Sequence, residues 1–197
     1  MTIATTDPLL IDVPLRLDTE RLVLRCPQPG DGAAYLEAIT ASLAELEPWM
    51  PWAHEPQELA RCEALARKFQ STYLARSDMP MAMFLRADDG GEGPLVGGVG
   101  LHRMDWSVPR FEIGYWCRSS HVGQGLVGEA VQALAAMAFT RLAAQRVEIR
   151  CDERNVRSAR VAERCGFTLE GVLRKDTRDV DGRPRNTRVY ARVAADG

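Results

Sequence analysis

Three short segments of alternating hydrophobicity follow one another in the middle of the chain. The segments are residues 79–87, 95–104 and 109–118, and turn or loop residues separate them. Strands joined by short turns pair antiparallel, whereas a strand, a helix and a strand in succession form a crossover that pairs parallel. Because residues 109–151 carry this second pattern as well, the sequence predicts a mixed α/β sheet and disfavours a doubly wound parallel one.

The flanking segments complete the list of expected elements. Residues 17–26 alternate like a strand, and two helical patterns follow. The first helix is predicted to be capped by Asp31 and to end at Pro48, and the second to start near Pro56. After the crossover we expect a helix closed by a left-handed glycine and two strands joined by a polar loop, at residues 155–165, 167–173 and 185–193.

The predicted order of elements is βααβββαβαββ, which is typical of a three-layer α/β domain with a mixed sheet. A chain of 197 residues fits one domain. We therefore expect an N-terminal extension over residues 1–16 and a single domain over residues 17–197.

The composition is that of an ordinary globular protein. Hydrophobic residues make up 46% of the chain, charged residues 26%, and the formal net charge is -2. This balance excludes global disorder and argues against nonspecific nucleic-acid binding, which needs basic surface. No apolar run approaches the ~20 residues of a membrane-spanning helix, and the start lacks the basic region of a signal peptide. We expect a cytoplasmic protein with no nucleic-acid or membrane partner.

The cysteines and histidines form no recognisable disulfide or metal pattern. Five cysteines are an odd number, no two of them form a CxxC pair, and there are only three histidines. We therefore expect no disulfide framework and no metal site. Each cysteine is predicted to be a small core residue: Cys26, Cys62, Cys117, Cys151 and Cys165.

Gly123, Gly125 and Gly128 satisfy the pattern GxGxxG between a predicted strand and a predicted helix. A dinucleotide-binding fold is therefore one interpretation, with Asp152 at the end of the next strand. It meets two objections, because the five residues 118–122 separate the strand from the first glycine, and only 69 residues follow the last one. The dinucleotide motif turns directly out of its strand and has further βαβ units after it.

A loop of the nucleoside-triphosphate type is not supported, because Glu129 and Ala130 stand where its Lys and Ser/Thr would be. What remains is a helix start whose backbone N–H groups point at an anion, and a pyrophosphate would suit it. The alternative is that the glycines only shape the turn.

The chain resembles the GNAT superfamily of N-acetyltransferases, in particular the RimJ/RimL-like branch that acetylates N-terminal amines of ribosomal proteins. The family opening TERLxLR matches residues 19–25, EIGYW matches 112–116, HxGxG matches 121–125 and GEA matches 128–130. The pattern NxxSxxVAExxGFxxEG fits residues 155–171. Each motif is short, but their joint order and spacing are specific.

The resemblance implies a GNAT-like fold with a V-shaped splay between two central strands, and acetyl-CoA as the cosubstrate bound in it. The pantetheine would pair with backbone near Trp116 and Cys117, and Asn155 and Ser158 would face the thioester. The pyrophosphate would lie on the backbone N–H groups of Val122, Gly123, Gln124, Gly125, Leu126, Val127 and Gly128.

The chain departs from the superfamily at two positions. Ser120 stands where many members have Gln or Arg before the glycines, and Ala162 stands where many have the Tyr that protonates the leaving thiolate. RimL-like members offer the Ser at position 158 instead. Ser158 is therefore the predicted hydrogen-bond donor to the thiolate, and a purely structural hydroxyl is the alternative.

Acetyl transfer needs a neutral amine, and an α-amine (pKa ~7.7–8.0) is more often neutral than a lysine amine (~10.4). Glu112 is the leading candidate for the base, because its strand leads into the predicted cleft, although an ion-paired strand carboxylate is the alternative. His102 on the neighbouring strand is the second candidate, and Asp176 is the third. The oxyanion would meet a backbone N–H from residues 115–117.

The sequence indicates the residues that would bind the acceptor less clearly than those that would bind the cosubstrate. Trp49, Met50, Pro51 and Trp52 would floor an acceptor groove or pack under a loop. The charged residues 174–185 would be solvated or would border the acceptor and favour acidic peptides. Glu129 is expected to serve the helix dipole or a buried polar contact.

We therefore expect an acetyl-CoA-dependent N-acetyltransferase, monomeric or homodimeric, whose acceptor is most simply a protein N-terminal α-amine. A small-molecule amine acetyltransferase and a non-catalytic acyl-CoA-binding module remain the alternatives.

Overall fold

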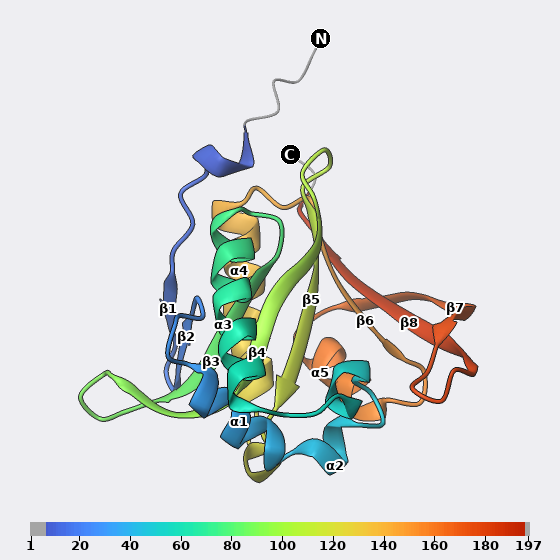
Figure 1. The fold of residues 1–197 in the computed structure, drawn as a ribbon. Coiled ribbons are helices and arrows are strands. Elements are labelled where there is room, and N and C mark those ends of the chain that lie inside the picture. Colours follow the sequence, from blue (N-terminus) through green and yellow to red (C-terminus); the bar gives the residue numbers. More distant parts are fainter. Residues whose placement is uncertain (1–6, 196–197) are drawn as a thin grey trace.

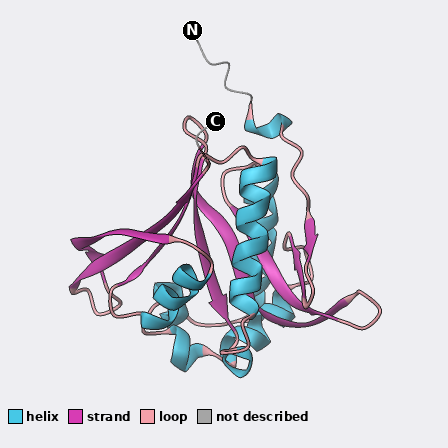
Figure 2. Ribbon diagram, turned by 180° about the vertical axis from the view of Figure 1, so that it is seen from behind, coloured by secondary structure: helices cyan, strands magenta, loops and turns pink. Residues whose placement is uncertain are grey.

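The computed structural model describes residues 7–195. In this part of the chain eight strands form one mixed sheet in the order β1-β2-β3-β4-β5-β6-β8-β7. Helices α1 and α3 cover one face, and α4 and α5 cover the other (Figures 1 and 2). The predicted three-layer mixed α/β fold is confirmed.

The strands are β1 Arg16–Asp18, β2 Leu22–Arg25, β3 Met79–Arg86, β4 Glu92–Asp105, β5 Arg110–Cys117, β6 Arg146–Asp152, β7 Thr168–Arg178 and β8 Pro184–Val193. The α-helices are α1 Gly32–Thr40, α2 Leu43–Leu46, α3 Leu59–Leu74, α4 Leu126–Arg141 and α5 Val156–Arg164. Three short 3-10 helices are η1 Pro8–Leu10, η2 Pro51–His54 and η3 Ser119–His121.

The parallel pair β5–β6 opens along its length. The two strands pair only where residues 110–112 lie opposite residues 146–148. Beyond that point β5 continues to Cys117 and β6 to Asp152, and the facing edges diverge (Figure 1). The V-shaped splay between two central strands is therefore confirmed.

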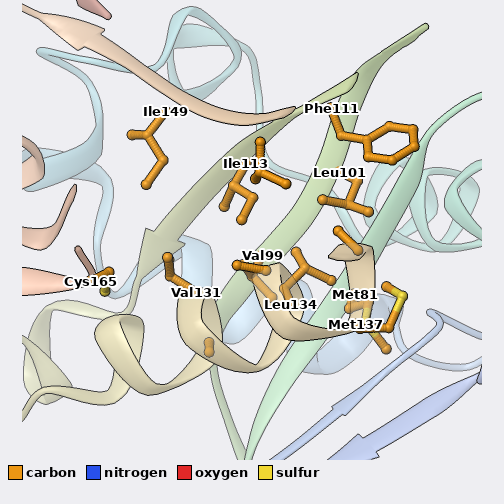
Figure 3. Close-up of a cluster of buried hydrophobic side chains, with 14 of the residues drawn as sticks. Met81, Val99, Leu101, Phe111, Ile113, Val131, Leu134, Met137, Ile149 and Cys165 are labelled. Atoms are coloured by element: carbon orange, nitrogen blue, oxygen red, sulfur yellow. The ribbon is translucent and has the colours of Figure 1, made fainter. Parts of the chain in front are cut away.

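The larger core fills the space between the sheet and α4. Side chains of β4 and β5, such as Val99 and Ile113, interdigitate with Val131 and Leu134 of α4 (Figure 3). All four of these side chains are buried, so the core fixes the position of α4, and with it the loop from which α4 starts.

Residues 17–26, predicted as one strand, form the hairpin of β1 and β2. The carboxylate of Glu129 holds the turn, because it accepts hydrogen bonds from the Thr19 hydroxyl at 2.6 Å and the Arg21 backbone N–H at 2.8 Å. The single-strand prediction was wrong because its hairpin turn depends on a residue far along the chain.

The first predicted helix is two helices, α1 and α2. Ser42 lies at the break. Its hydroxyl donates to the carbonyl of Ala38 at 2.8 Å and accepts from the Ser119 backbone N–H at 3.0 Å. A side chain that bonds to backbone in this way competes with the helical ladder, and here it ties α1 to the loop after β5.

Asp31, the predicted cap of α1, makes no side-chain cap. Its carboxylate instead binds the Arg25 guanidinium through two hydrogen bonds of 2.7 Å, and Arg25 also binds Glu92 at 2.7 Å. Because Arg25 and Asp31 are both buried, this ion-paired group joins β2, β4 and the start of α1.

Helix α3 starts at Leu59 rather than near Pro56. The side-chain amide of Gln57 donates to the carbonyls of Trp52 and Glu55, at 3.3 and 2.6 Å. These bonds hold the preceding residues in a turn and delay the helix by three residues.

The last two strands are longer than predicted. β7 runs to Arg178 and β8 starts at Pro184, so most of the expected polar loop is strand and residues 179–183 make the turn. The carboxylate of Asp179 accepts from the backbone N–H of Arg183 at 2.9 Å, which closes this turn.

The proposed boundary between an extension and a domain stays a prediction. Residues 1–6 and 196–197 lie outside the described part. In the rest of the extension, the Pro14 carbonyl accepts from the Tyr73 hydroxyl at 2.6 Å, and the Ile11 carbonyl accepts from Arg76 at 3.1 Å.

The structure shows where the five cysteines lie and how long and apolar the described helices are. Four cysteines are buried, and Cys117 is partly exposed. Between residues 7 and 195, no helix is both long and apolar enough to cross a bilayer.

Candidate active site

A cavity of about 220 Å³ lies where β5 and β6 separate. Both walls of the opening contribute to it, together with the start of α5, the segment after α2 and the end of the last hairpin. Its lining comprises residues 48–51, 112–115, 149–152 and 178–180, with Asn155, Ser158 and Arg185.

Glu112 is the carboxylate that β5 places in this cavity. Its side chain is 17% exposed, and its Oε2 lies 3.4 Å from Arg103 and 3.9 Å from Arg150. Oε2 accepts no hydrogen bond from any described residue. Burial raises the pKa of Glu112, and the two arginines offset this only in part. A carboxylate whose pKa is raised toward neutrality is suited to accept a proton.

His102, the second predicted base, lies directly opposite Glu112 on β4 and therefore on the same face of the sheet. Its Nδ1 is 2.7 Å from Asp78 Oδ1. The imidazole packs over Gly100 and Gly114, where added Cβ atoms would come within 2.9 and 2.8 Å of the ring. His102 is thus an oriented imidazole beside the cavity lining.

Asp176, the third predicted base, is not part of the cavity lining. It lies on β7 and forms an ion pair with Arg150 at 2.9 Å. The structure therefore places Asp176 behind Arg150, while Glu112 and His102 are brought together.

Ser158 lies on the other side of the opening, in the first turns of α5. Its Oγ is 2.8 Å from the Tyr115 hydroxyl, and its backbone N–H donates to Asn155 Oδ1 at 3.0 Å. Asn155 lines the cavity and its Oδ1 serves as the N-cap of α5, while its contact with the thioester stays a prediction.

Replacing Asn155 with Ala should lower the free energy of unfolding by about 1 kcal/mol, the usual effect of losing an N-cap acceptor. Asn155→Asp keeps the acceptor and should retain the stability. Urea denaturation measures both changes. Full stability of the Ala variant would contradict the capping role, whereas weaker CoA binding by a stable Asp variant would indicate that the amide donates to the cosubstrate.

The glycine loop leads into α4 through two left-handed residues. Gly123 and Gly125 have φ values of +84° and +81°, which favour glycine. In the part of the chain that the structure describes, the backbone N–H groups of residues 123–128 have no acceptor. Free N–H groups at the start of a 16-residue helix are an arrangement suited to an anion, and the pyrophosphate site stays a prediction.

Arg21 brings a guanidinium to this loop, where it is ion-paired with Glu129. Its Nη1 donates to the Gln124 carbonyl at 2.8 Å, and its Nε donates to Glu129 at 2.7 Å. Glu129 therefore makes the polar contact that was one of its two expected roles. The guanidinium of Arg21 comes from the β1–β2 turn. Ser120, at the position where many superfamily members have Gln or Arg, carries no charge.

The backbone N–H and C=O groups of successive residues in β5 point alternately toward β4 and toward the β6 side. The N–H of Arg118 donates to the Val96 carbonyl of β4 at 2.8 Å. Trp116 therefore also directs its backbone toward β4, while Tyr115 and Cys117 direct theirs toward the opening. The backbone groups of Cys117 therefore face the opening and those of Trp116 do not, and the pantetheine contact near these two residues stays a prediction.

The predicted acceptor residues divide into two groups. Trp49 lines the cavity together with Met50 and Pro51. Trp52 instead packs against Trp116 in a T-shaped contact, with ring centroids 6.1 Å apart, on the face that α1 and α3 cover. The end of the last hairpin, expected to be solvated or to border the acceptor, contributes Arg178 and Arg185 to the cavity.

Reasoning from the sequence missed two side chains at this site, Tyr115 and Arg21. The strand parity that Tyr115 shares with the buried Ile113 is the signal that points its phenol toward α5. Arg21 belongs to the motif at residues 19–25, but no local pattern connects it with the glycine loop. Among residues 7–195, no group of three or more His, Cys, Asp or Glu side chains is placed to hold a metal ion.

The fold and site define an α/β protein with a central parallel strand pair that separates, free backbone N–H groups at the start of a helix, and a polar cavity. Residues 21–168 match the family model described as acetyltransferase (GNAT) domain. That match covers more than half of the chain, and the protein belongs to this family of acetyltransferases.

Named relatives agree with this assignment. The chain is 35% identical over 102 residues to the ribosomal-protein-serine acetyltransferase of Escherichia coli (strain K12), over 52% of this chain and 56% of the relative. The microcin C7 self immunity acetyltransferase MccE, in complex with acetyl-CoA and AMP, superimposes with a TM-score of 0.83 at 21% identity and covers 92% of this chain and 98% of its own. The ribosomal L7/L12 α-N-protein acetyltransferase RimL, in complex with coenzyme A, gives a TM-score of 0.81 at 22% identity, over 92% and 97%.

Proposed function

We propose that the protein transfers the acetyl group of acetyl-CoA to the α-amine at the N-terminus of a peptide or protein. The separation of β5 and β6 carries this proposal, because it presents the partly buried carboxylate of Glu112 and a pair of hydroxyl groups in one cavity. The free N–H groups before α4 would bind the pyrophosphate. The complex of coenzyme A with a protein of the same fold supports this choice of cosubstrate.

Glu112 would accept the proton of the attacking amine, directly or through a water. Burial raises its pKa toward that of an α-amine, which makes the transfer easier than it would be for an exposed carboxylate. A backbone N–H of Tyr115 or Cys117, both facing the opening, would stabilise the oxyanion. As the C–S bond breaks, its electron pair stays on the sulfur, and Ser158 would donate a hydrogen bond to that thiolate.

The cysteines beside the opening favour direct transfer over an acyl-enzyme. Burial raises the pKa of Cys117 to about 11, and it also raises the pKa of Cys151. Since the thiolate is the nucleophilic form of cysteine, neither side chain is suited to take the acetyl group at neutral pH.

The choice of an α-amine follows from its pKa and from the relatives. At pH 7 roughly 10% of an α-amine but only about 0.04% of a lysine amine is neutral. The E. coli relative is named for ribosomal-protein serine. A small-molecule amine is the second candidate, because the complex of MccE contains AMP.

Acetyl-CoA at about 100 times its dissociation constant should stabilise the fold by ~2.7 kcal/mol, and NAD should not. Thermal melts with each compound measure this effect. In a screen read by CoA release, a peptide with a free N-terminus should react faster than the same peptide with a blocked N-terminus and one lysine. Faster acetylation of the lysine would reject the proposed acceptor, and binding without CoA release from any amine would indicate a non-catalytic module.

A further inference from the structure

Two hydroxyl groups meet at the α5 side of the opening. The Tyr115 hydroxyl lies 2.8 Å from Ser158 Oγ and 3.1 Å from the Ser158 carbonyl oxygen. Both residues line the cavity. In the described part of the chain, Ser158 is the residue with which this phenol forms its hydrogen bonds.

The phenol has one hydrogen to donate in this pair. Burial raises the pKa of Tyr115 well above its usual range, and the hydrogen bond with Ser158 opposes this only in part. The phenol therefore keeps its single hydrogen at neutral pH, and of the two Ser158 oxygens within reach Oγ is the closer, at 2.8 Å against 3.1 Å for the carbonyl. Ala162, one turn further along the same face of α5, offers no competing polar group.

A hydrogen bond from Tyr115 to Ser158 Oγ determines where the serine's own hydrogen points. Oγ then accepts on the Tyr115 side, so its O–H is directed away from the phenol. The neighbouring Cys151 thiol is only a weak acceptor. Ser158 also lines the cavity, where a bound thiolate would be a stronger acceptor than this thiol.

We propose that Tyr115 donates this hydrogen to Ser158 Oγ and is thereby a positioning residue that orients the Ser158 hydroxyl toward the sulfur of the departing CoA, a role that rests on the proposed function. When the tetrahedral intermediate collapses, the C–S bond breaks and its electron pair stays on sulfur. The Ser158 O–H donates a hydrogen bond to that thiolate, and no proton is transferred at this point. The proton of the amine has already passed to Glu112.

The first test is a double-mutant cycle in single-turnover kinetics with saturating acetyl-CoA. Tyr115→Phe and Ser158→Ala should each slow transfer about tenfold, the effect of one hydrogen bond to a charged group. The double variant should be no slower than Ser158→Ala, because Tyr115 acts through Ser158. Independent effects that multiply to about a hundredfold would overturn the proposal. Tyr73→Phe, which removes the hydroxyl of a buried tyrosine that bonds to Pro14, should leave the rate unchanged.

The second test is the pKa of the thiol of bound CoA, followed by the ultraviolet absorbance of the thiolate. An oriented donor stabilises the thiolate, so this pKa should be lower in the wild type than in Tyr115→Phe or Ser158→Ala, and Tyr73→Phe should match the wild type. A merely structural role of Tyr115 would not shift it. Should Tyr115→Phe fail to fold, an unchanged thiol pKa in Ser158→Ala overturns the proposal by itself.

The two proposals fail in different ways. If the wild type binds no CoA in calorimetry, the proposed function is rejected, and the role of Tyr115 with it. If the wild type binds CoA and transfers acetyl groups, but Tyr115→Phe matches it in rate and in thiol pKa, only the role of Tyr115 is rejected.

Discussion

Replacing Gly125 with Asp is expected to weaken CoA binding about a hundredfold while the fold persists. Gly125 has a φ of +81° and lies just before α4, and Asp is one of the residues that tolerate this conformation. A Cβ there would lie 3.5 Å from the nearest atom, Nη2 of Arg21, so it meets no backbone. The new carboxylate would stand beside the bound pyrophosphate. Like charges about 5 Å apart repel by ~3 kcal/mol at an effective dielectric constant of ~20.

Gly125→Asn is the matched control for this prediction. Asn has nearly the same shape and the same tolerance of the left-handed region, but no charge, so its effect on CoA affinity should stay below about tenfold. Isothermal titration with CoA measures both variants, and circular dichroism confirms their fold. Equal losses in the two variants would show that charge is not the cause, and an unchanged affinity of the folded Asp variant would place the pyrophosphate elsewhere.

Local sequence patterns were sufficient to predict the mixed sheet, but not the places where the structure differs from the predicted elements. The change from period two to helical spacing between residues 109 and 151 indicates a crossover, and the crossover requires a parallel pair. The reversal between β1 and β2 depends instead on Glu129, which is 108 residues from Arg21 along the chain. The break between α1 and α2 likewise depends on Ser119, 77 residues from Ser42. Contacts of this kind exist only after folding, so no window of sequence contains them.

The candidate site was likewise predictable from local patterns only in part. Motif spacing indicated Glu112, Ser158 and the glycine loop, and the structure brings the first two into one cavity. The N-cap role of Asn155 was not predicted, because a residue type that suits a cosubstrate contact also suits an N-cap. Tyr115 could not be paired with Ser158 in advance, since their hydroxyl contact joins residues 43 apart in the sequence.

Replacing Glu112 with Gln should reduce kcat by roughly 10²- to 10⁴-fold, the usual contribution of a positioned base. The wild-type rate should rise with pH as Glu112 ionises and should rise further as the amine loses its proton. Because Gln does not titrate, the variant should keep only the rise that belongs to the amine. Steady-state rates with a peptide acceptor at several pH values measure this profile. An unchanged profile would move the role of base to His102.

The same substitution should stabilise the fold at neutral pH. Burial raises the pKa of folded Glu112, so its favourable contribution is fully present below the unfolded pKa of about 4.3 and is lost as pH rises through the folded value. The ionised carboxylate therefore costs stability at pH 7, and Gln removes that cost. The variant should melt at a higher temperature than the wild type at pH 7, and the difference should vanish at low pH.

Glu170 provides a control of opposite sign for this prediction. Hydrogen bonds from Arg146 hold the pKa of Glu170 below its usual range, so its contribution to stability is present above the unfolded pKa and is lost as pH falls through the folded one. Glu170→Gln should therefore lower the melting temperature at pH 7 and leave it unchanged at low pH. If Glu112→Gln behaves like Glu170→Gln, Arg103 and Arg150 stabilise a structural ion pair at Glu112. If it behaves in the opposite way and is inactive, the carboxylate is held at a cost in stability because it serves as the base.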